Sequence, residues 1–335
     1  MLRPLILATT ALTVAAPAFA QELNLYSSRH YDTDERLYSD FEEATGITIN
    51  RIEGNADELI ERMVAEGENS PADILLTVDA SRIARAEQAG VLQPIESDVL
   101  ADAIPAELQD DDGHWFGFSQ RARMFFYVAD RVENPPQTYM DLADPAYNDM
   151  VCMRSATNVY SQTLLAAIIE NEGEEAARTW AAGLLENLAR DPQGGDTDQL
   201  RGLVSGECDI AVSNSYYFAR ALRKEVDGLS DSVENIAWVY PNQASNGAHV
   251  NISAGGVAAH APNRENAIAF LEYLASEQAQ SYFADGNDEF PVVEGVPVSA
   301  SVAELGSFEG DSVDLAAVAD NVPLAQQIYN ETGWE

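Results

Sequence analysis

Short β-like runs alternate with amphipathic helical stretches along most of this chain, and this alternation restricts the fold more than any other feature. In the first hundred residues the strand-like runs are 22–27, 47–52 and 72–77, and the helical stretches are 34–45, 56–66 and 81–89. A strand, helix, strand order is typical of parallel sheets covered by helices. The pattern predicts a doubly wound α/β lobe, with Gly90 ending its third helix.

A second alternating series follows an acidic turn at residues 110–113. Between the two series, residues 115–128 are expected to form one long extended segment. The later strands are expected at 150–154, 209–213, 236–240 and 250–259, and the later helices at 160–171, 174–187, 198–205, 217–224, 263–284 and 322–331. One hydrophobic core rarely organises more than about 250–300 residues, so this 335-residue chain is predicted to form two lobes.

The N-terminus has the pattern of a cleavable secretion signal. Arg3 supplies a basic start, residues 5–16 are apolar, and Ala18-Phe19-Ala20 has the small residues that signal peptidase requires. Residues 1–20 are therefore expected to be a signal peptide that directs the protein to the periplasm, with Gln21 as the mature N-terminus. No apolar run reaches the ~20 residues of a spanning helix, so no membrane insertion is expected.

The formal net charge is −38, and Lys224 is the only lysine. A surface of this sign repels nucleic acid and anionic membranes, which argues against nucleic-acid binding. It attracts cations. The same acidity also keeps an exported protein solvated in a salty medium, where ions screen the self-repulsion. The charge alone therefore does not identify a cationic ligand.

The chain has two cysteines, Cys152 and Cys208. An even number of cysteines in a chain sent to an oxidising compartment favours a disulfide. Two sulfurs without a Cys-x-x-Cys spacing are too few for a zinc or iron–sulfur site. A disulfide between them is the expected state.

Three of the turns that follow predicted strands carry tyrosine. Such turns matter because ligands of open α/β sheets bind beyond the carboxyl ends of the strands. They are residues 26–34 with His30 and Tyr31, residues 154–162 with Tyr160, and residues 213–220 with Tyr216 and Tyr217. An extended third turn would point Tyr216 and Tyr217 to opposite faces, whereas a helix capped by Asn214 or Ser215 would let both rings lean toward one point.

Tyrosine in these places suits a hard, highly charged metal ion. A helix N-terminus favours negative charge, and Fe(III) prefers anionic oxygen to imidazole or thiolate. A bound trivalent cation also lowers the phenol pKa far below its ordinary value of ~10. One tyrosine at a strand–helix junction is usually a packing residue, but here three separate turns carry them. The other histidines, His114, His249 and His260, lack metal-ligand spacing and are expected to be structural.

Four segments carry a resemblance to a known family. They are Ser-Ser-Arg-His-Tyr-Asp-Thr-Asp at 27–34, Arg-Ala-Arg-Met-Phe-Phe-Tyr at 121–127, Ser-Ala-Thr-Asn-Val-Tyr-Ser-Gln at 155–162, and Gly-Glu-Cys-Asp followed by Ser-Asn-Ser-Tyr-Tyr within 206–217. In this order they resemble the ferric-iron-binding periplasmic proteins of the FutA and Fbp type, over essentially the whole mature chain. The resemblance implies a fold like the type II periplasmic binding proteins, in which two α/β lobes are joined by a hinge of crossing strands. The implied lobes are residues 21–118 plus 244–294 and residues 119–243 plus 295–335.

The resemblance also implies roles for individual residues. The implied ligands of Fe3+ are the phenolates of Tyr160, Tyr216 and Tyr217, with Tyr31 as a further ligand and His30 beside it either binding or orienting. An arginine of the crossing segment, Arg121 or Arg123, would offset surplus phenolate charge, and Arg121 is favoured. The alternative role for both arginines is a hinge salt bridge. The resemblance places Cys152 and Cys208 on the strands that lead to Tyr160 and Tyr216, where a disulfide would tie two ligand-bearing loops together.

The function that the resemblance implies is transport. A monomeric binding protein would carry Fe3+, as transported ligand rather than catalytic cofactor, to the permease and ATPase of an ABC importer. A bound external anion such as carbonate is less expected, because the His-Tyr loop argues for a site built from protein groups. Another small solute is the alternative: a polyamine, which needs carboxylates and aromatic walls, or an oxyanion, which needs helix-terminal amides and arginine. An exported enzyme on the same scaffold is not expected, because the sequence has no Ser-His-Asp elbow and no Gly-rich phosphate loop.

Overall fold

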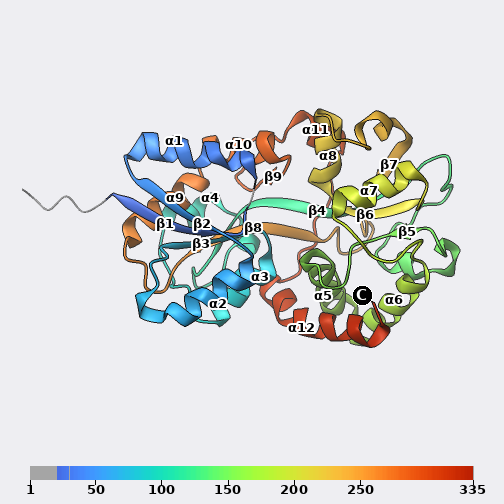
Figure 1. Ribbon diagram of the computed structural model, residues 1–335, viewed down its shortest axis with the longest axis horizontal. Coiled ribbons are helices and arrows are strands. Elements are labelled where there is room, and N and C mark those ends of the chain that lie inside the picture. The colour runs from blue at the N-terminus through green and yellow to red at the C-terminus, as the bar shows by residue number, and fades with distance from the viewer. Residues whose placement is uncertain (1–20, 30, 335) are drawn as a thin grey trace, which may run out of the picture.

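Two α/β lobes lie side by side and are joined by two long strands, β4 (Phe116–Val128) and β8 (Val250–Val257), that run from one lobe to the other (Figure 1). The computed structural model describes residues 21–29 and 31–334. The expected signal peptide, residues 1–20, lies outside this part of the chain. The predicted two-lobed fold with a hinge of crossing strands is confirmed.

The strands form one mixed sheet that continues through both lobes. The remaining strands are β1 (Glu22–Ser27), β2 (Thr48–Glu53), β3 (Ile74–Thr77), β5 (Val151–Cys152), β6 (Ile210–Asn214), β7 (Ile236–Val239) and β9 (Phe290–Pro291). The order is β2-β1-β3-β8-β4-β6-β5, with β7 and β9 also pairing with β4. β1 is parallel to β2 and β3, β5 is parallel to β6, and β4 is antiparallel to all of its partners. Asn214, the last residue of β6, lies opposite Arg123 near the middle of β4, so the turn after β6 begins beside the crossing strands.

Helices cover the sheet in each lobe. Those of the first lobe are α1 (Glu35–Thr45), α2 (Ala56–Glu66), α3 (Ala80–Gln88), α4 (Asp98–Ala103), α9 (Arg264–Leu274) and α10 (Glu277–Asn287). Those of the second lobe are α5 (Val159–Glu172), α6 (Glu174–Glu186), α7 (Asp196–Ser205), α8 (Ser215–Arg223), α11 (Ala300–Glu304) and α12 (Leu315–Thr332). α12 packs against α5 and also against α3, so it touches both lobes (Figure 1). No helix in the described part of the chain has the length and apolarity needed to cross a bilayer.

Two expectations about the C-terminal third were wrong. The single helix expected at 263–284 is two helices, because the Ser276 hydroxyl accepts a hydrogen bond from the Ala279 amide and starts α10. The last helix begins at Leu315 and continues through Pro323. Proline removes a backbone donor and usually breaks a helix, which is why the sequence predicted a later start.

Three clusters of buried apolar side chains form the core. The first takes its residues from 23–118 and 252–315. The other two take theirs from 125–334 and 122–305. The crossing strand β4 contributes to all three, since Phe118 belongs to the first cluster, Phe125 to the second and Phe126 to the third. Both lobes are therefore anchored to the same strand.

Cys152 and Cys208 form a disulfide, as predicted, with their Cα atoms 5.8 Å apart. The bond ties β5 to the turn that leads into β6, and both side chains are buried. α7 packs tightly over it at Gly202, where an added Cβ would lie 2.8 Å from the Cys208 sulfur and 3.0 Å from the Cys152 sulfur. The strands that precede Tyr160 and Tyr216 are thus held together by a covalent bond.

Replacing both cysteines with alanine is expected to lower the free energy of unfolding by about 4 kcal/mol, because the disulfide closes a loop of 56 residues. Urea denaturation of the iron-free protein would measure the loss. The wild-type protein unfolded in reductant should match the double variant. A difference below about 1 kcal/mol would contradict the prediction.

Candidate metal centre

The first tyrosine turn is fixed by a buried arginine. Tyr31 directly precedes a short 3-10 helix, Asp32–Asp34. The Arg29 side chain donates from Nε and Nη2 to the two Asp34 carboxylate oxygens, at 2.7 and 3.0 Å, and both side chains are buried. The Ser27 hydroxyl also accepts from the Arg29 amide. These hydrogen bonds fix the path of the chain between the end of β1 and the residues that follow Tyr31. His30 lies outside the described residues, so its expected role beside Tyr31 stays a prediction.

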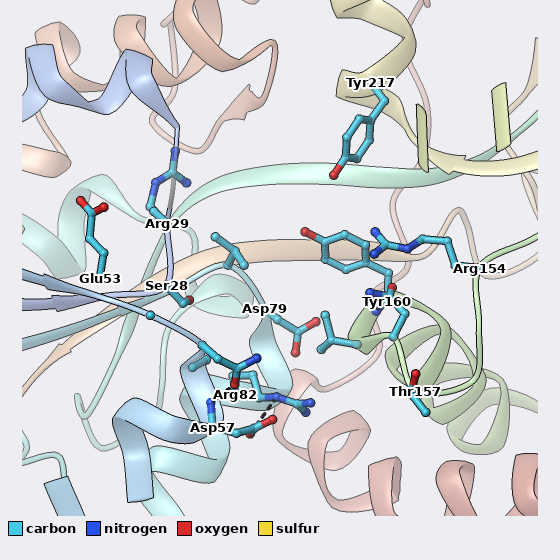
Figure 2. A pocket seen from close by; sticks show the side chains of 16 residues that line it. Ser28, Arg29, Glu53, Asp57, Asp79, Arg82, Arg154, Thr157, Tyr160 and Tyr217 are labelled. Carbon is cyan, nitrogen blue, oxygen red and sulfur yellow. Dashed lines mark hydrogen bonds and ion pairs between the residues drawn. The ribbon is translucent and has the colours of Figure 1, made fainter. Parts of the chain in front are cut away.

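The second tyrosine lies in the first turn of a capped helix. α5 begins at Val159, and the Asn158 side chain accepts a hydrogen bond from the Tyr160 amide at 3.0 Å. An asparagine cap of this kind satisfies one of the free amides at a helix start. Tyr160 is thereby placed at the end of α5 that faces the first lobe (Figure 2).

The third tyrosine turn, residues 213–220, is helical rather than extended. Asn214 is extended and α8 begins at the next residue, so Tyr216 and Tyr217 both fall in the first turn of the helix. Their ring centroids are 4.1 Å apart and the ring planes differ by 30°. An extended chain would have sent them to opposite faces. The two rings instead lie against each other, tilted, at the start of α8.

The structure brings the four predicted tyrosines together. The hydroxyl oxygens of Tyr31, from the first lobe, and Tyr216, from the second, are 3.4 Å apart. Figure 2 shows the hydroxyls of Tyr160 and Tyr217 directed into the same gap between the lobes. Electrostatic coupling links Tyr160 to each of the other three. The cluster therefore joins residues from three turns that are far apart in the sequence.

Three phenols of this cluster, those of Tyr31, Tyr216 and Tyr217, have a raised pKa. Burial is the largest cause that raises the pKa of Tyr31 and Tyr216 well above the usual range, and the nearby Tyr160 is the next cause for both. Burial also raises the pKa of Tyr217, as does the carboxylate of Asp196. Several phenolates cannot share this space unless a cation balances them. The arrangement therefore suits a small, highly charged cation.

Arg121 and Arg123 both approach the cluster from β4. Each guanidinium carbon lies 5.9 Å from the centre of the Tyr160 ring, and both side chains are buried. Arg121 Nη1 donates to the Ser253 hydroxyl at 3.1 Å and lies 3.8 Å from Glu289. Arg123 Nη1 donates to Asp196, and to the side-chain Oδ1 of Asn214 at 3.0 Å. Both arginines therefore lie beside a tyrosine and also pair with a buried carboxylate, and their expected role in offsetting phenolate charge stays a prediction.

Sequence reasoning assigned no role to Arg154, which also lies at the cluster. Its guanidinium carbon is 5.4 Å from the Tyr160 ring centre, and Nη1 donates to Asp196 at 2.7 Å. One signal in the sequence could have found it: Arg154 closely follows β5, at the start of the turn that carries Tyr160. Asp196 gives no such signal, because it begins a helix with no tyrosine nearby in the sequence.

A cleft of about 570 Å³ opens beside the tyrosines. It is lined from the first lobe by Ser28, Arg29 and Arg82, and from the second by Arg154, Tyr160 and Tyr217 (Figure 2). Tyr216 is fully buried behind it. The cleft gives the tyrosine cluster a route to solvent between the lobes.

The histidines expected to be structural lie apart from the cleft lining. His249 is buried, and burial lowers its pKa to about 3, so it is neutral. His114 Nδ1 lies 2.9 Å from Asp110, and Glu87 completes a group whose ligand atoms are all within 4.8 Å. The same Asp110 oxygen accepts from the amides of Asp112 and His114, so the group is explained by the hydrogen bonds of its own turn.

Comparison with known proteins identifies the family to which this chain belongs. The family described as bacterial extracellular solute-binding protein matches residues 69–306. The chain belongs to this family. Within it, this solute-binding protein groups with ferric-iron-binding proteins of the FutA and Fbp type. It is 46% identical over 320 residues to Iron uptake protein A1 of Synechocystis, covering 95% of this chain and 89% of that protein.

Two solved structures extend the comparison. A Trichodesmium protein (IdiA, FutA) in complex with iron and citrate ligands is 45% identical to this solute-binding protein, with a TM-score of 0.89 over 94% of this chain and 100% of that one. The ferric binding protein from Campylobacter jejuni is 39% identical, with a TM-score of 0.88 over 93% and 100% of the two chains. The expected type II periplasmic binding protein fold is confirmed.

Proposed function

We propose that this chain is the solute-binding protein of an iron(III) ABC importer, and that it captures Fe3+ with the phenolates of Tyr31, Tyr160, Tyr216 and Tyr217. One observation carries the proposal: the hydroxyls of Tyr31 and Tyr216, from opposite lobes, are 3.4 Å apart, with Tyr160 and Tyr217 beside them. Four converging oxygens that can ionise form the donor set that hard Fe(III) prefers.

The charge of the site explains how it selects the ion. The raised pKa of Tyr31, Tyr216 and Tyr217 keeps these phenols protonated in the free protein, so binding through them must release protons. A trivalent cation stabilises phenolates far better than a divalent one, because the attraction grows with the product of the charges. The overall charge of −38 raises the local concentration of any cation. The names of relatives such as Iron uptake protein A1 agree with this assignment.

The alternative solutes fit less well. A polyamine site needs carboxylates that are free to bind amines. Three carboxylates line this cleft, but Glu53 pairs with Arg51, Asp57 pairs with Arg82 and Arg85, and Asp79 accepts hydrogen bonds from Ser81, Thr163 and Asn251. An oxyanion would suit Arg29, Arg82 and Arg154, which also line the cleft, but would leave four converging phenols without a role. Catalysis is not part of the proposal, since relatives in this family are named as binding and uptake proteins.

The two-lobed architecture suggests how the protein would enclose the ion and deliver it. We propose boundaries at residues 21–118 plus 244–294 and 119–243 plus 295–335, which the composition of the three apolar clusters supports. The lobes would close on Fe3+ by bending β4 and β8, because each strand spans the junction. The monomer would then deliver the ion in the periplasm to the permease and ATPase of the importer, after removal of residues 1–20.

The experiment is an iron titration of the purified metal-free protein. Ferric citrate, which keeps Fe(III) in solution, is added stepwise while the visible spectrum is recorded. We expect a phenolate-to-iron charge-transfer band that saturates at one iron per chain. Spermidine and phosphate, titrated alone in a calorimeter, are the controls and should give no heat of binding. A colourless protein, or saturable binding of spermidine or phosphate, would overturn the proposal.

A further inference from the structure

Three consecutive residues, Asn287, Asp288 and Glu289, form a buried turn where α10 of the first lobe ends. Asp288 has a left-handed backbone, with a φ of 59°. Few residues other than glycine adopt this conformation, and aspartate and asparagine are enriched among them. The side chains of this 287–289 turn make contacts in both lobes.

Two of these side chains hold the turn that carries Tyr31. Asn287 Nδ2 donates to Asp34 Oδ1 at 3.0 Å. Glu289 Oε2 accepts from Nη1 and Nη2 of Arg29, both at 3.3 Å, and Glu289 also contacts β4. Arg29 and Asp34 stand on either side of Tyr31 in the sequence, so the position of Tyr31 is tied to this end of α10.

The middle side chain, Asp288, binds the second lobe instead. Its carboxylate is fully buried and accepts from Arg223 Nε at 3.0 Å and from Arg223 Nη2 at 2.8 Å. It also accepts from the hydroxyls of Ser299 and Ser301, at 3.2 and 2.7 Å, at the start of α11. Arg223 Nη2 donates in addition to the Gly286 carbonyl oxygen at 3.2 Å. A guanidinium that meets both oxygens of a carboxylate makes a strong and directional contact.

Arg223 is the last residue of α8, and the first turn of the same helix carries Tyr216 and Tyr217. This helix has nine residues, so its two ends are about 14 Å apart. At its start α8 directly follows β6, and at its end it is held by Asp288. A short helix that is fixed at both ends cannot tilt freely. The position of its two tyrosines relative to the first lobe therefore depends on the ion pair at its far end.

The lobes also touch on the other side of the crossing strands. Figure 1 shows α8, α10 and α11 above β4 and β8, and α3, α5 and α12 below them. Below, Asp79 at the start of α3 accepts from the Thr163 hydroxyl of α5 at 3.0 Å. That contact is one hydrogen bond from a neutral donor, whereas Arg223 makes two charge-assisted bonds to Asp288. The stronger of these two contacts is thus on the side of α8.

We infer that the 287–289 turn is a bridge that sets the spacing of the two halves of the ligand set, with the Asp288–Arg223 ion pair as its link to the second lobe. The inference rests on the proposed function. Tyr31 is attached to one side of the bridge and Tyr216 to the other, and their hydroxyl oxygens are 3.4 Å apart. The lobes can part at this point only if the ion pair lengthens. Asp288 is therefore a positioning residue, which acts through α8 and favours the closed arrangement that binds iron.

The test uses Asp288→Asn, Arg223→Met and the double variant. Asparagine tolerates the left-handed backbone and still accepts hydrogen bonds from the serine hydroxyls, so Asp288→Asn removes the charge with little change of shape. Arg131→Met is the matched control. Arg131 belongs to the same lobe as Arg223, its side chain is 36% exposed against 35%, and it pairs with Asp209 inside that lobe at 2.7 Å.

Three quantities are measured on each variant. Chelator competition gives the affinity for Fe3+, and stopped-flow loss of the charge-transfer band gives the rate of release. Small-angle X-ray scattering gives the radius of gyration of the metal-free protein, which does not depend on iron. Thermal melting confirms that each variant is folded.

Asp288→Asn and Arg223→Met are each expected to bind Fe3+ about 10-fold more weakly, because the apparent affinity falls with the fraction of chains in the closed arrangement. Most of the loss should appear as faster release. Both metal-free variants should have a larger radius of gyration than wild type. The double variant should be no weaker than either single variant, because all three remove the same ion pair.

Arg131→Met should match wild type in all three measurements. Affinities in Asp288→Asn and Arg223→Met equal to that of Arg131→Met would overturn the inference. So would an unchanged radius of gyration, or losses that add up in the double variant. A wild-type protein without the iron band would instead defeat the proposed function.

Discussion

Replacing Tyr216 with phenylalanine is expected to lower the affinity for Fe3+ by more than about 100-fold and to weaken the charge-transfer band. The substitution removes an anionic oxygen that lies 3.4 Å from the Tyr31 hydroxyl, at the centre of the cluster. Loss of a group that only supports a metal ligand costs about 10–100-fold in affinity, so loss of a ligand should cost more. Tyr160→Phe is expected to act in the same way, because the Tyr160 hydroxyl points into the same gap between the lobes as that of Tyr217 (Figure 2). Chelator competition followed in the visible spectrum would measure both effects.

Tyr240→Phe is the matched control for these variants. The Tyr240 hydroxyl makes no hydrogen bond within the described part of the chain, and its ring stacks on Phe308 away from the cleft. Phenylalanine keeps the ring in every case, so the three variants should melt within a few degrees of wild type. If Tyr160→Phe and Tyr216→Phe bind iron as tightly as Tyr240→Phe, these two tyrosines are not ligands.

Replacing Asp196 with alanine is expected to lower the free energy of unfolding by about 3–5 kcal/mol. The change leaves Arg123 and Arg154 facing each other without a counter-charge, and Arg123 is fully buried. It also removes the acceptor for the Asn214 amide at the start of α8. Urea denaturation of the metal-free protein measures the loss. Glu207→Ala removes an exposed partner of Arg190 and should cost no more than about 1 kcal/mol.

The contribution of Asp196 to the free energy of unfolding should depend on pH. Burial alone would raise the pKa of Asp196, but Arg123 and Arg154 outweigh burial and hold the pKa below its usual range. A carboxyl with a lowered pKa in the folded state stabilises the protein above its unfolded pKa of ~3.9. The difference between wild type and Asp196→Ala should therefore be full at neutral pH and should shrink as the pH falls below about 4. A difference that does not change between pH 7 and pH 3 would contradict this account.

Local sequence pattern predicted most of the elements that carry the site. The helix α2 has the predicted bounds, and β6 and α8 begin within two residues of the predicted positions. These elements have clear periods of two or 3.6 residues, which depend only on neighbouring residues. The pattern failed at Ser276 and Pro323, where a cap divides one apolar stretch and the packing of α12 keeps a proline inside a helix.

The sequence by itself determined which residue types stand at the ends of which strands. Tyr31, Tyr160, Tyr216 and Tyr217 could be singled out because each follows a predicted strand, and the disulfide followed from the number of cysteines and the route of export.

Only the tertiary structure decided how these residues meet and which charged side chains lie beside them. Tyr31 and Tyr216 are 185 residues apart in the chain, and their contact exists because β4 and β8 cross between the lobes. Asp196 begins α7, Arg123 lies in β4 and Arg154 follows β5, so only the folded chain brings these three side chains into contact. Periodicity describes neighbours along the chain, whereas the charge of a site is a sum over neighbours in space.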